Sequence, residues 1–150
     1  SSALSHQTDT LTTMTASHSR KPHRANSKPA KRGYKFERLV AWQRAMDSCT
    51  RAYEESKRFP REELYGLTSQ LRRASVPIPL NIAEGCGCDS DKGFAQFLTV
   101  ALRSQYEVVT ILRLAERLGY ISKELSQQME EDCSEVGKLV QGLRHSLSQD

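Results

Sequence analysis

The sequence predicts an all-α fold, an up-down-up-down four-helix bundle built from residues 34–150. Apolar residues recur there in steps of three and four, the period of an amphipathic helix, and no segment alternates like a strand. Pro and Gly residues divide this pattern into four long segments with short connections. Short connections place consecutive helices antiparallel, which predicts the up-down order.

The first predicted helix covers about residues 36–59. Its apolar stripe has heptad-like spacing and is expected to face the core: Phe36, Leu39, Trp42, Met46, Cys49 and Tyr53. The second helix is expected to begin at Pro60, because a proline at the first helical position loses no hydrogen bond. Gly85 and Gly87 end it.

The second helix contains Pro77 and Pro79 in its interior. An interior proline removes a backbone donor and costs roughly 3 kcal/mol. The apolar spacing nevertheless continues through both prolines: Leu64, Leu67, Leu71, Ala74, Ile78 and Ile82. This combination predicts a helix that is kinked at Pro77 and Pro79 and held together by tertiary packing.

The third and fourth helices have clear end signals. Asp89 or Ser90 is the expected N-cap of the third helix, which runs to Leu118 and ends at Gly119 in a left-handed conformation. Ser122 is the expected N-cap of the fourth helix. One face of that helix is apolar: Leu125, Met129, Cys133, Val136, Val140, Leu143 and Leu147.

The third helix has two apolar stripes. The first is expected to face the core: Phe94, Phe97, Ala101, Val108, Leu112 and Ala115. The second is rotated by about 100° from it: Leu98, Leu102, Tyr106 and Val109. A helix that is apolar over so much of its circumference usually has a second partner, so we expect the second stripe to form a homo-oligomer interface. A wide contact inside one bundle is the alternative.

Residues 1–33 are predicted to be a disordered basic arm, because they contain almost no large apolar side chains. Six of them are basic and expected to contact RNA or DNA: Arg20, Lys21, Arg24, Lys28, Lys31 and Arg32. With Asp9 the arm has a net charge of +5, whereas the whole chain has +4. No apolar run is long enough for a membrane span, and unpaired cysteines fit a cytoplasmic protein.

The segments FERLVAWQRA (36–45), RFPREELYGLTSQLRRASVPIPLNIAEG (58–85), FAQFLTVALRS (94–104) and LGYIS (118–122) resemble a known family. This is the four-helix-bundle family encoded by intervening sequences of bacterial 23S ribosomal RNA. The resemblance implies an all-helical protomer that assembles into a ring, typically a homopentamer, without catalytic activity. A related group, the accessory proteins of diversity-generating retroelements, binds nucleic acid and reverse transcriptase.

Arg72 and Arg73 are the candidate nucleic-acid contacts within the bundle. Adjacent helical residues project about 100° apart, so the two side chains cannot both face the core. Phosphate contact is one interpretation. The other is ion pairing with Glu84, Glu107 or another protomer, or a solvated helix face. Glu84 lies near a helix C-terminus, where a carboxylate is unfavourable, so it is expected to have a basic partner from this pair.

The four cysteines do not predict a shared metal site. Cys49 lies about 20 Å along the first helix from the Cys86–Cys88 turn, too far for one zinc ion, and is expected with Cys133 in the core. A site of Cys86, Cys88 and His145 is sterically conceivable. A redox-sensitive thiol pair and an inert thiol pair are the alternatives, and the inert pair is favoured. No catalytic constellation and no cofactor motif is present, so we expect no enzyme and no bound cofactor.

These observations predict a non-enzymatic homo-oligomeric scaffold that contacts RNA or DNA through its arm and ring surface. The first alternative is a protein–protein adaptor, for example for a reverse transcriptase, without nucleic-acid affinity. The second is a metal- or redox-responsive module that uses Cys86 and Cys88.

Overall fold

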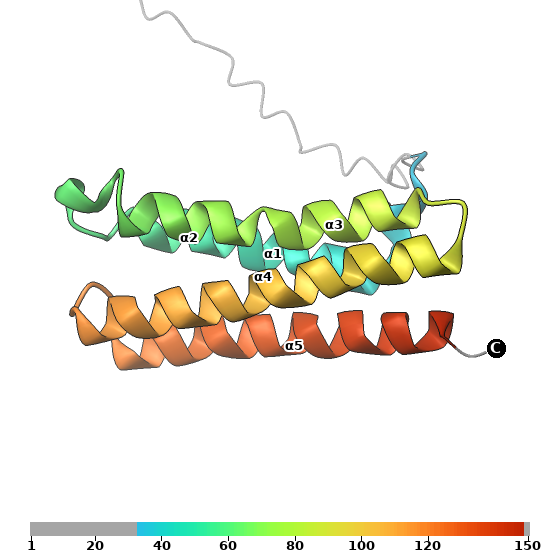
Figure 1. Cartoon of the computed structure of the whole chain (residues 1–150). Coiled ribbons are helices and arrows are strands. Elements are labelled where there is room, and N and C mark those ends of the chain that lie inside the picture. The colour runs from blue at the N-terminus through green and yellow to red at the C-terminus, as the bar shows by residue number, and fades with distance from the viewer. Residues whose placement is uncertain (1–32, 149–150) are drawn as a thin grey trace, which may run out of the picture. The chain divides into compact units, whose positions relative to one another are not determined.

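The computed structural model describes residues 33–148, which are all-helical and contain no strand (Figure 1). The elements are η1 (Lys35–Arg38), α1 (Val40–Ser56), η2 (Arg61–Glu63), α2 (Leu67–Ser75), α3 (Pro77–Cys86), α4 (Asp91–Arg117) and α5 (Lys123–Leu147). The predicted all-α class is confirmed for this part of the chain. The predicted arm lies outside it, except for Gly33.

The predicted face of α1 is only partly confirmed: Leu39 and Trp42 pack partly buried against the core, but the fully buried residues are their neighbours. Its buried residues are small: Ala41, Ala45, Ala52 and Ser56. Met46 and Tyr53, from the predicted stripe, are 41% and 39% exposed. Small side chains let α1 lie close to both α5 and the α2–α3 pair, and this tertiary contact outweighs the heptad-like spacing of the larger residues.

The predicted second helix is two helices, and it begins later than Pro60. Pro60 precedes only the 3-10 turn η2, and α2 starts at Leu67, whose backbone N–H donates to Glu63 Oε2 at 2.7 Å. The helix is interrupted at Val76, which keeps helical dihedral angles between α2 and α3.

Hydrogen bonds support the chain around the two prolines. The Val76 N–H donates to the Arg72 carbonyl, and the Leu80 N–H donates to the Val76 carbonyl, both at 3.2 Å. The Asn81 carboxamide donates to the Pro77 carbonyl at 2.7 Å. The backbone therefore passes from α2 to α3 without a turn, although neither proline can donate.

The predicted ends of α4 and α5 are confirmed. Ser90 Oγ accepts from the Gly93 N–H, and Ser122 Oγ accepts from the Leu125 N–H, each at 3.1 Å. Gly119 has φ of +76°, the left-handed conformation that glycine adopts most easily.

Helix α4 packs against α2 and α3 on one side and α5 on the other (Figure 1). Arg113 near the end of α4 pairs with Glu130 early in α5, whereas Thr99 near its start accepts from Arg144 late in α5. These contacts run in opposite directions along the two helices, so α4 and α5 are antiparallel.

The expectation that Leu98 and Leu102 form an exposed stripe is wrong. Leu98 is fully buried and Leu102 is only 8% exposed, so both belong to the core of the protomer. Val109 packs partly buried against that core. Helix α4 is apolar over a wide arc because it contacts three helices, which is the alternative that the sequence left open. Within the four-residue stripe, Tyr106 remains, with 74% of its surface exposed.

Within the described part of the chain, no helix is long and apolar enough to cross a membrane.

Candidate interaction surface

Arg72 joins α2 to the end of α1. Its Nε donates to Ser56 Oγ at 3.1 Å, and its Nη2 donates to the Tyr53 carbonyl at 3.4 Å. The guanidinium carbon also lies 5.0 Å from the centre of the Tyr53 ring, a cation–π distance. Arg72 therefore uses much of its hydrogen-bonding capacity inside the protomer.

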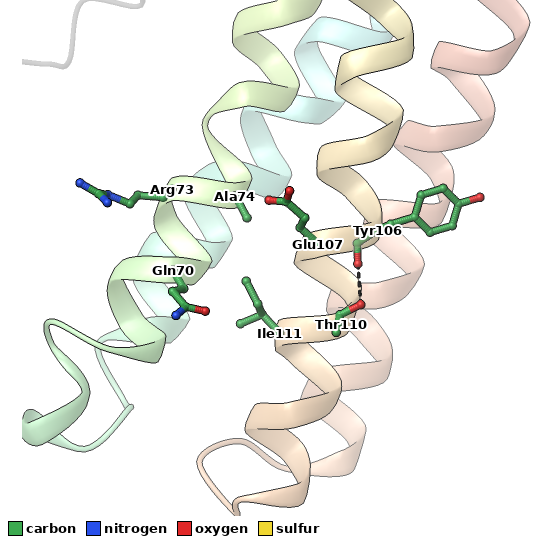
Figure 2. A pocket seen from close by; sticks show the side chains of 7 residues that line it. All are labelled: Gln70, Arg73, Ala74, Tyr106, Glu107, Thr110 and Ile111. Carbon is green, nitrogen blue, oxygen red and sulfur yellow. Dashed lines mark hydrogen bonds between the residues drawn. The ribbon is translucent and has the colours of Figure 1, made fainter.

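Arg73 points to solvent at the edge of a groove between α2 and α4 (Figure 2). The groove has a volume of about 560 Å³ and is lined by Gln70, Arg73, Ala74, Tyr106, Glu107, Thr110 and Ile111. Ala74 and Ile111 supply apolar surface between the helices, and the Glu107 carboxylate reaches from α4 toward α2. Arg73 and Tyr106 project outward on opposite sides of it (Figure 2).

Three other arginines are neutralised by ion pairs with α5. Arg44 pairs with Glu135, Arg51 with Asp132 and Arg113 with Glu130, at 3.5, 2.8 and 2.6 Å. The hydrogen bond and charge of Glu130 raise the pKa of the Arg113 guanidinium above its usual value. These three guanidinium groups are paired within the protomer and therefore present little net positive charge to a ligand.

The charged groups around the groove are not neutralised in this way. Neither Arg73 nor Glu107 forms an ion pair with any residue that the structure describes, and neither does Arg103, one turn before Glu107 on α4. The predicted partner for Glu84 is also missing among these residues, because Arg72 is directed toward α1 instead. Arg73 and Glu107 thus line the groove without an ion pair to a described residue, and Arg103 lies one helical turn from Glu107.

The cysteines do not form a metal centre within residues 33–148. No group of three His, Cys, Asp or Glu side chains there has a metal-binding arrangement, so Cys86, Cys88 and His145 are not brought together as one. Cys86 and Cys88 are half-buried free thiols, and Cys88 Sγ lies 3.8 Å from the Glu84 carbonyl.

Cys133 occupies the core as predicted, whereas Cys49 is only half-buried. Burial raises the pKa of the Cys133 thiol to about 11, so this thiol stays protonated at neutral pH. Burial also raises the pKa of the Cys49 thiol. A protonated thiol is a poor nucleophile and a poor metal ligand, which fits a packing role.

The structure tests only part of the predicted site. Arg72 and Arg73 lie on different sides of α2, and only Arg73 lies at the edge of the groove. Gln70, Thr110 and Ile111 were not predicted. Their signal in the sequence is weak, since the four-residue spacing of Glu107 and Ile111 only indicates a shared helix face. The six basic arm residues lie outside the described residues: Arg20, Lys21, Arg24, Lys28, Lys31 and Arg32.

The chain matches a family model and a solved structure. The family model of the 23S rRNA-intervening sequence protein matches residues 37–142. A solved structure of a protein with unknown function, from the S23 ribosomal protein family of Bacteroides thetaiotaomicron VPI-5482, has a TM-score of 0.66. It is 24% identical over 70% of this chain and 98% of its own, which shows the fold alone. No curated protein matches the chain.

Proposed function

Since this chain belongs to the 23S rRNA-intervening sequence protein family, we propose that it is a non-enzymatic scaffold that self-associates and contacts RNA or DNA. In this proposal the protomer is an up-down-up-down four-helix bundle, in which α2 and α3 together form the second helix, kinked at Pro77 and Pro79. Several copies, typically five, form a ring. The basic arm and the surface of the ring contact the nucleic acid.

The distribution of charge carries the nucleic-acid part of the proposal. Residues 33–148 contain 16 basic and 16 acidic side chains and are therefore neutral overall. Residues 20–32 contain six basic side chains and no acidic one. A polyanion is attracted to uncompensated positive charge, so the arm is the part of the chain that it meets first.

Exposed apolar side chains support self-association. On α4, Val100 and Leu114 are exposed together with Tyr106, and Leu118 is exposed at the C-cap of this helix. Other exposed apolar residues lie on α1 to α3: Met46, Tyr53, Val76 and Leu80. Contact with another protein surface removes such side chains from water, which favours association. The family resemblance makes a second copy of this chain the first candidate.

Fluorescence anisotropy with a labelled single-stranded RNA tests the role of the arm. We expect binding by the full chain to weaken steeply with salt. The slope of log K against log salt is about −4 when six side chains each neutralise one phosphate. A variant with all six arm residues changed to Gln should lose most of this slope. A control variant with six exposed basic residues of the bundle changed to Gln should keep the slope. These residues are Lys35, Arg38, Lys57, Arg61, Lys123 and Lys138.

Equal binding by the full chain and the arm variant would contradict the proposal. An adaptor without nucleic-acid affinity is the second candidate, favoured by the side chain of Tyr65, which is 93% exposed between η2 and α2. For such an adaptor we expect no anisotropy change at low salt with either protein, and copurification of a partner that survives nuclease treatment.

A further inference from the structure

Helix α1 presents an apolar ridge whose charge is opposite to that of the α2–α4 groove. We define the ridge as Met46, Asp47, Thr50, Tyr53 and Glu54. Met46 and Tyr53 lie seven residues apart, about 10 Å along the same side of α1. Asp47 and Glu54 have the same spacing beside them, and neither carboxylate forms an ion pair with a described residue.

The groove patch has the matching properties. It combines the groove residues with Arg103, so that two uncompensated guanidinium groups stand against one carboxylate, Glu107. On α4 the groove extends from Tyr106 to Ile111, and on α2 from Gln70 to Ala74. These spans are about 8 Å and about 6 Å, shorter than the ridge of about 10 Å, so the groove covers part of the ridge.

From this complementarity we propose that the ridge of one copy docks into the groove patch of the next copy. The inference rests on the self-association in the proposed function and names the surfaces that perform it. Met46 and Tyr53 cover the apolar walls at Ala74 and Ile111. The carboxylates of Asp47 and Glu54 neutralise the guanidinium groups of the neighbouring copy, so each copy uses one surface of each kind.

The two surfaces lie on different sides of each copy. The ridge lies on the side of α2 that carries Arg72, which stacks on Tyr53, and the groove lies on the side that carries Arg73. Each copy therefore has one surface for each of two neighbours. Head-to-tail contacts of this kind form a ring when the rotation from copy to copy closes.

The test compares two charge-reversed variants of the full chain, freed of nucleic acid by nuclease treatment. The groove variant is Arg73→Glu with Arg103→Glu, and the ridge variant is Asp47→Lys with Glu54→Lys. Lys123→Glu with Lys138→Glu is the matched control, because both lysines are exposed on α5, a helix that contributes to neither surface. Sedimentation velocity gives the masses, and circular dichroism confirms that each variant keeps its helices.

We expect each variant alone to dissociate to single copies, with at least about a tenfold weaker association, while the control keeps the wild-type mass. An equimolar mixture of the two variants should regain assemblies larger than a dimer. The native ridge of the groove variant meets the native groove of the ridge variant, and the reversed ridge meets the reversed groove, so opposite charges face each other at both contacts.

Several outcomes overturn the inference. Unchanged masses of both variants show that copies associate elsewhere, and the proposed function then stands without this interface. If the wild-type chain sediments as a single copy, both this inference and the self-association in the proposed function are overturned. If the groove variant keeps its mass but loses RNA binding, the groove serves nucleic acid instead. If a charge reversal unfolds the chain, Tyr106→Ser replaces the groove variant and Met46→Ser replaces the ridge variant. If both serine variants keep the mass of the wild-type assembly, the docking is rejected.

Discussion

At the scale of single residues, two adjacent arginines with the same chemistry have different roles. Arg72 contacts Ser56 and the Tyr53 carbonyl and ring, whereas Arg73 contacts no described partner through an ion pair or hydrogen bond. The sequence predicts that the two side chains diverge, because helix geometry is local. It does not predict which one is used inside the protomer, because that depends on where α1 ends in space.

We expect Arg72→Gln to lower the free energy of unfolding by about 1–2 kcal/mol, because two hydrogen bonds from a charged donor and one ring contact are lost. Arg72→Lys should lose nearly as much, since an ammonium group cannot make the forked contact. Urea unfolding at one pH measures both. Arg73→Gln is the matched control and should stay within about 0.5 kcal/mol of the wild type. Equal effects at the two positions would show that Arg72 is not a link between helices.

The buried Cys133 thiol should make stability depend on alkaline pH. Its pKa is about 11 in the folded chain and near its ordinary value of 9.0 in the unfolded chain. The folded chain therefore holds the proton more tightly. The stabilisation is complete below pH 9 and is lost as pH rises through 11.

The size of this effect can be measured as the slope of the unfolding free energy between pH 9 and pH 11. Two pKa units correspond to roughly 2–3 kcal/mol at most. We expect Cys133→Ala to be less stable at pH 7, because it leaves a cavity, but to show a smaller alkaline slope. An unchanged slope would mean that Cys133 is not the titrating group.

At the scale of elements, end signals are predicted better than faces. Ser90, Ser122 and Gly119 act where the sequence places them, because capping depends on a few neighbouring residues. The buried face of α1 is predicted only in part because the close approach of α5 and the α2–α3 pair selects Ala41 and Ala45 over larger residues. Such a choice depends on residues far away in the sequence.

The interruption between α2 and α3 should disappear when Pro77 is replaced. Pro77→Ala restores an N–H that can donate to the Arg73 carbonyl one turn back. The gain is partly offset because alanine gives the unfolded chain more freedom. We expect a net stabilisation of about 1 kcal/mol and higher helicity by circular dichroism. A loss of stability would instead show that the packing of Ile78 and Ile82 requires the interruption.

Gly85 sets the distance between α3 and α4. A Cβ atom there would lie 2.6 Å from Phe94 Cδ2 and 2.8 Å from Phe97 Cβ. Because Phe97 Cβ is attached directly to the backbone, it cannot move aside like the end of a flexible side chain. We therefore expect Gly85→Ala to cost about 1–3 kcal/mol in thermal or urea unfolding.

For Gly142 we expect substitution by alanine to have the opposite effect on stability. It is exposed in α5, and a Cβ atom there meets nothing within 4 Å. Gly142→Ala should stabilise the chain by up to about 1 kcal/mol through helix propensity alone. If both alanine variants were equally stable, close packing at Gly85 would not control the spacing of α3 and α4.

At the scale of the whole molecule, positive charge is divided between ion pairs inside the bundle and the nucleic-acid contact that we propose for the arm. Within residues 33–148, Arg44, Arg51 and Arg113 bind acidic residues of α5. The sequence predicts this division only in outline, as a neutral bundle beside a basic arm. It could not show that Leu98 and Leu102 are buried or that a groove separates α2 from α4, because both depend on how the helices pack.

This division predicts different salt dependences for folding and for nucleic-acid binding. The ion pairs with α5 are partly exposed, and exposed pairs contribute little to stability. Raising NaCl from 50 to 500 mM should therefore change the free energy of unfolding by less than about 1 kcal/mol. Over the same range, a slope of about −4 lowers RNA affinity by roughly four orders of magnitude. Urea unfolding and anisotropy on one protein preparation give both values. Parallel losses of stability and affinity would mean that the contact with RNA depends on the ion pairs of the bundle and not on the basic arm.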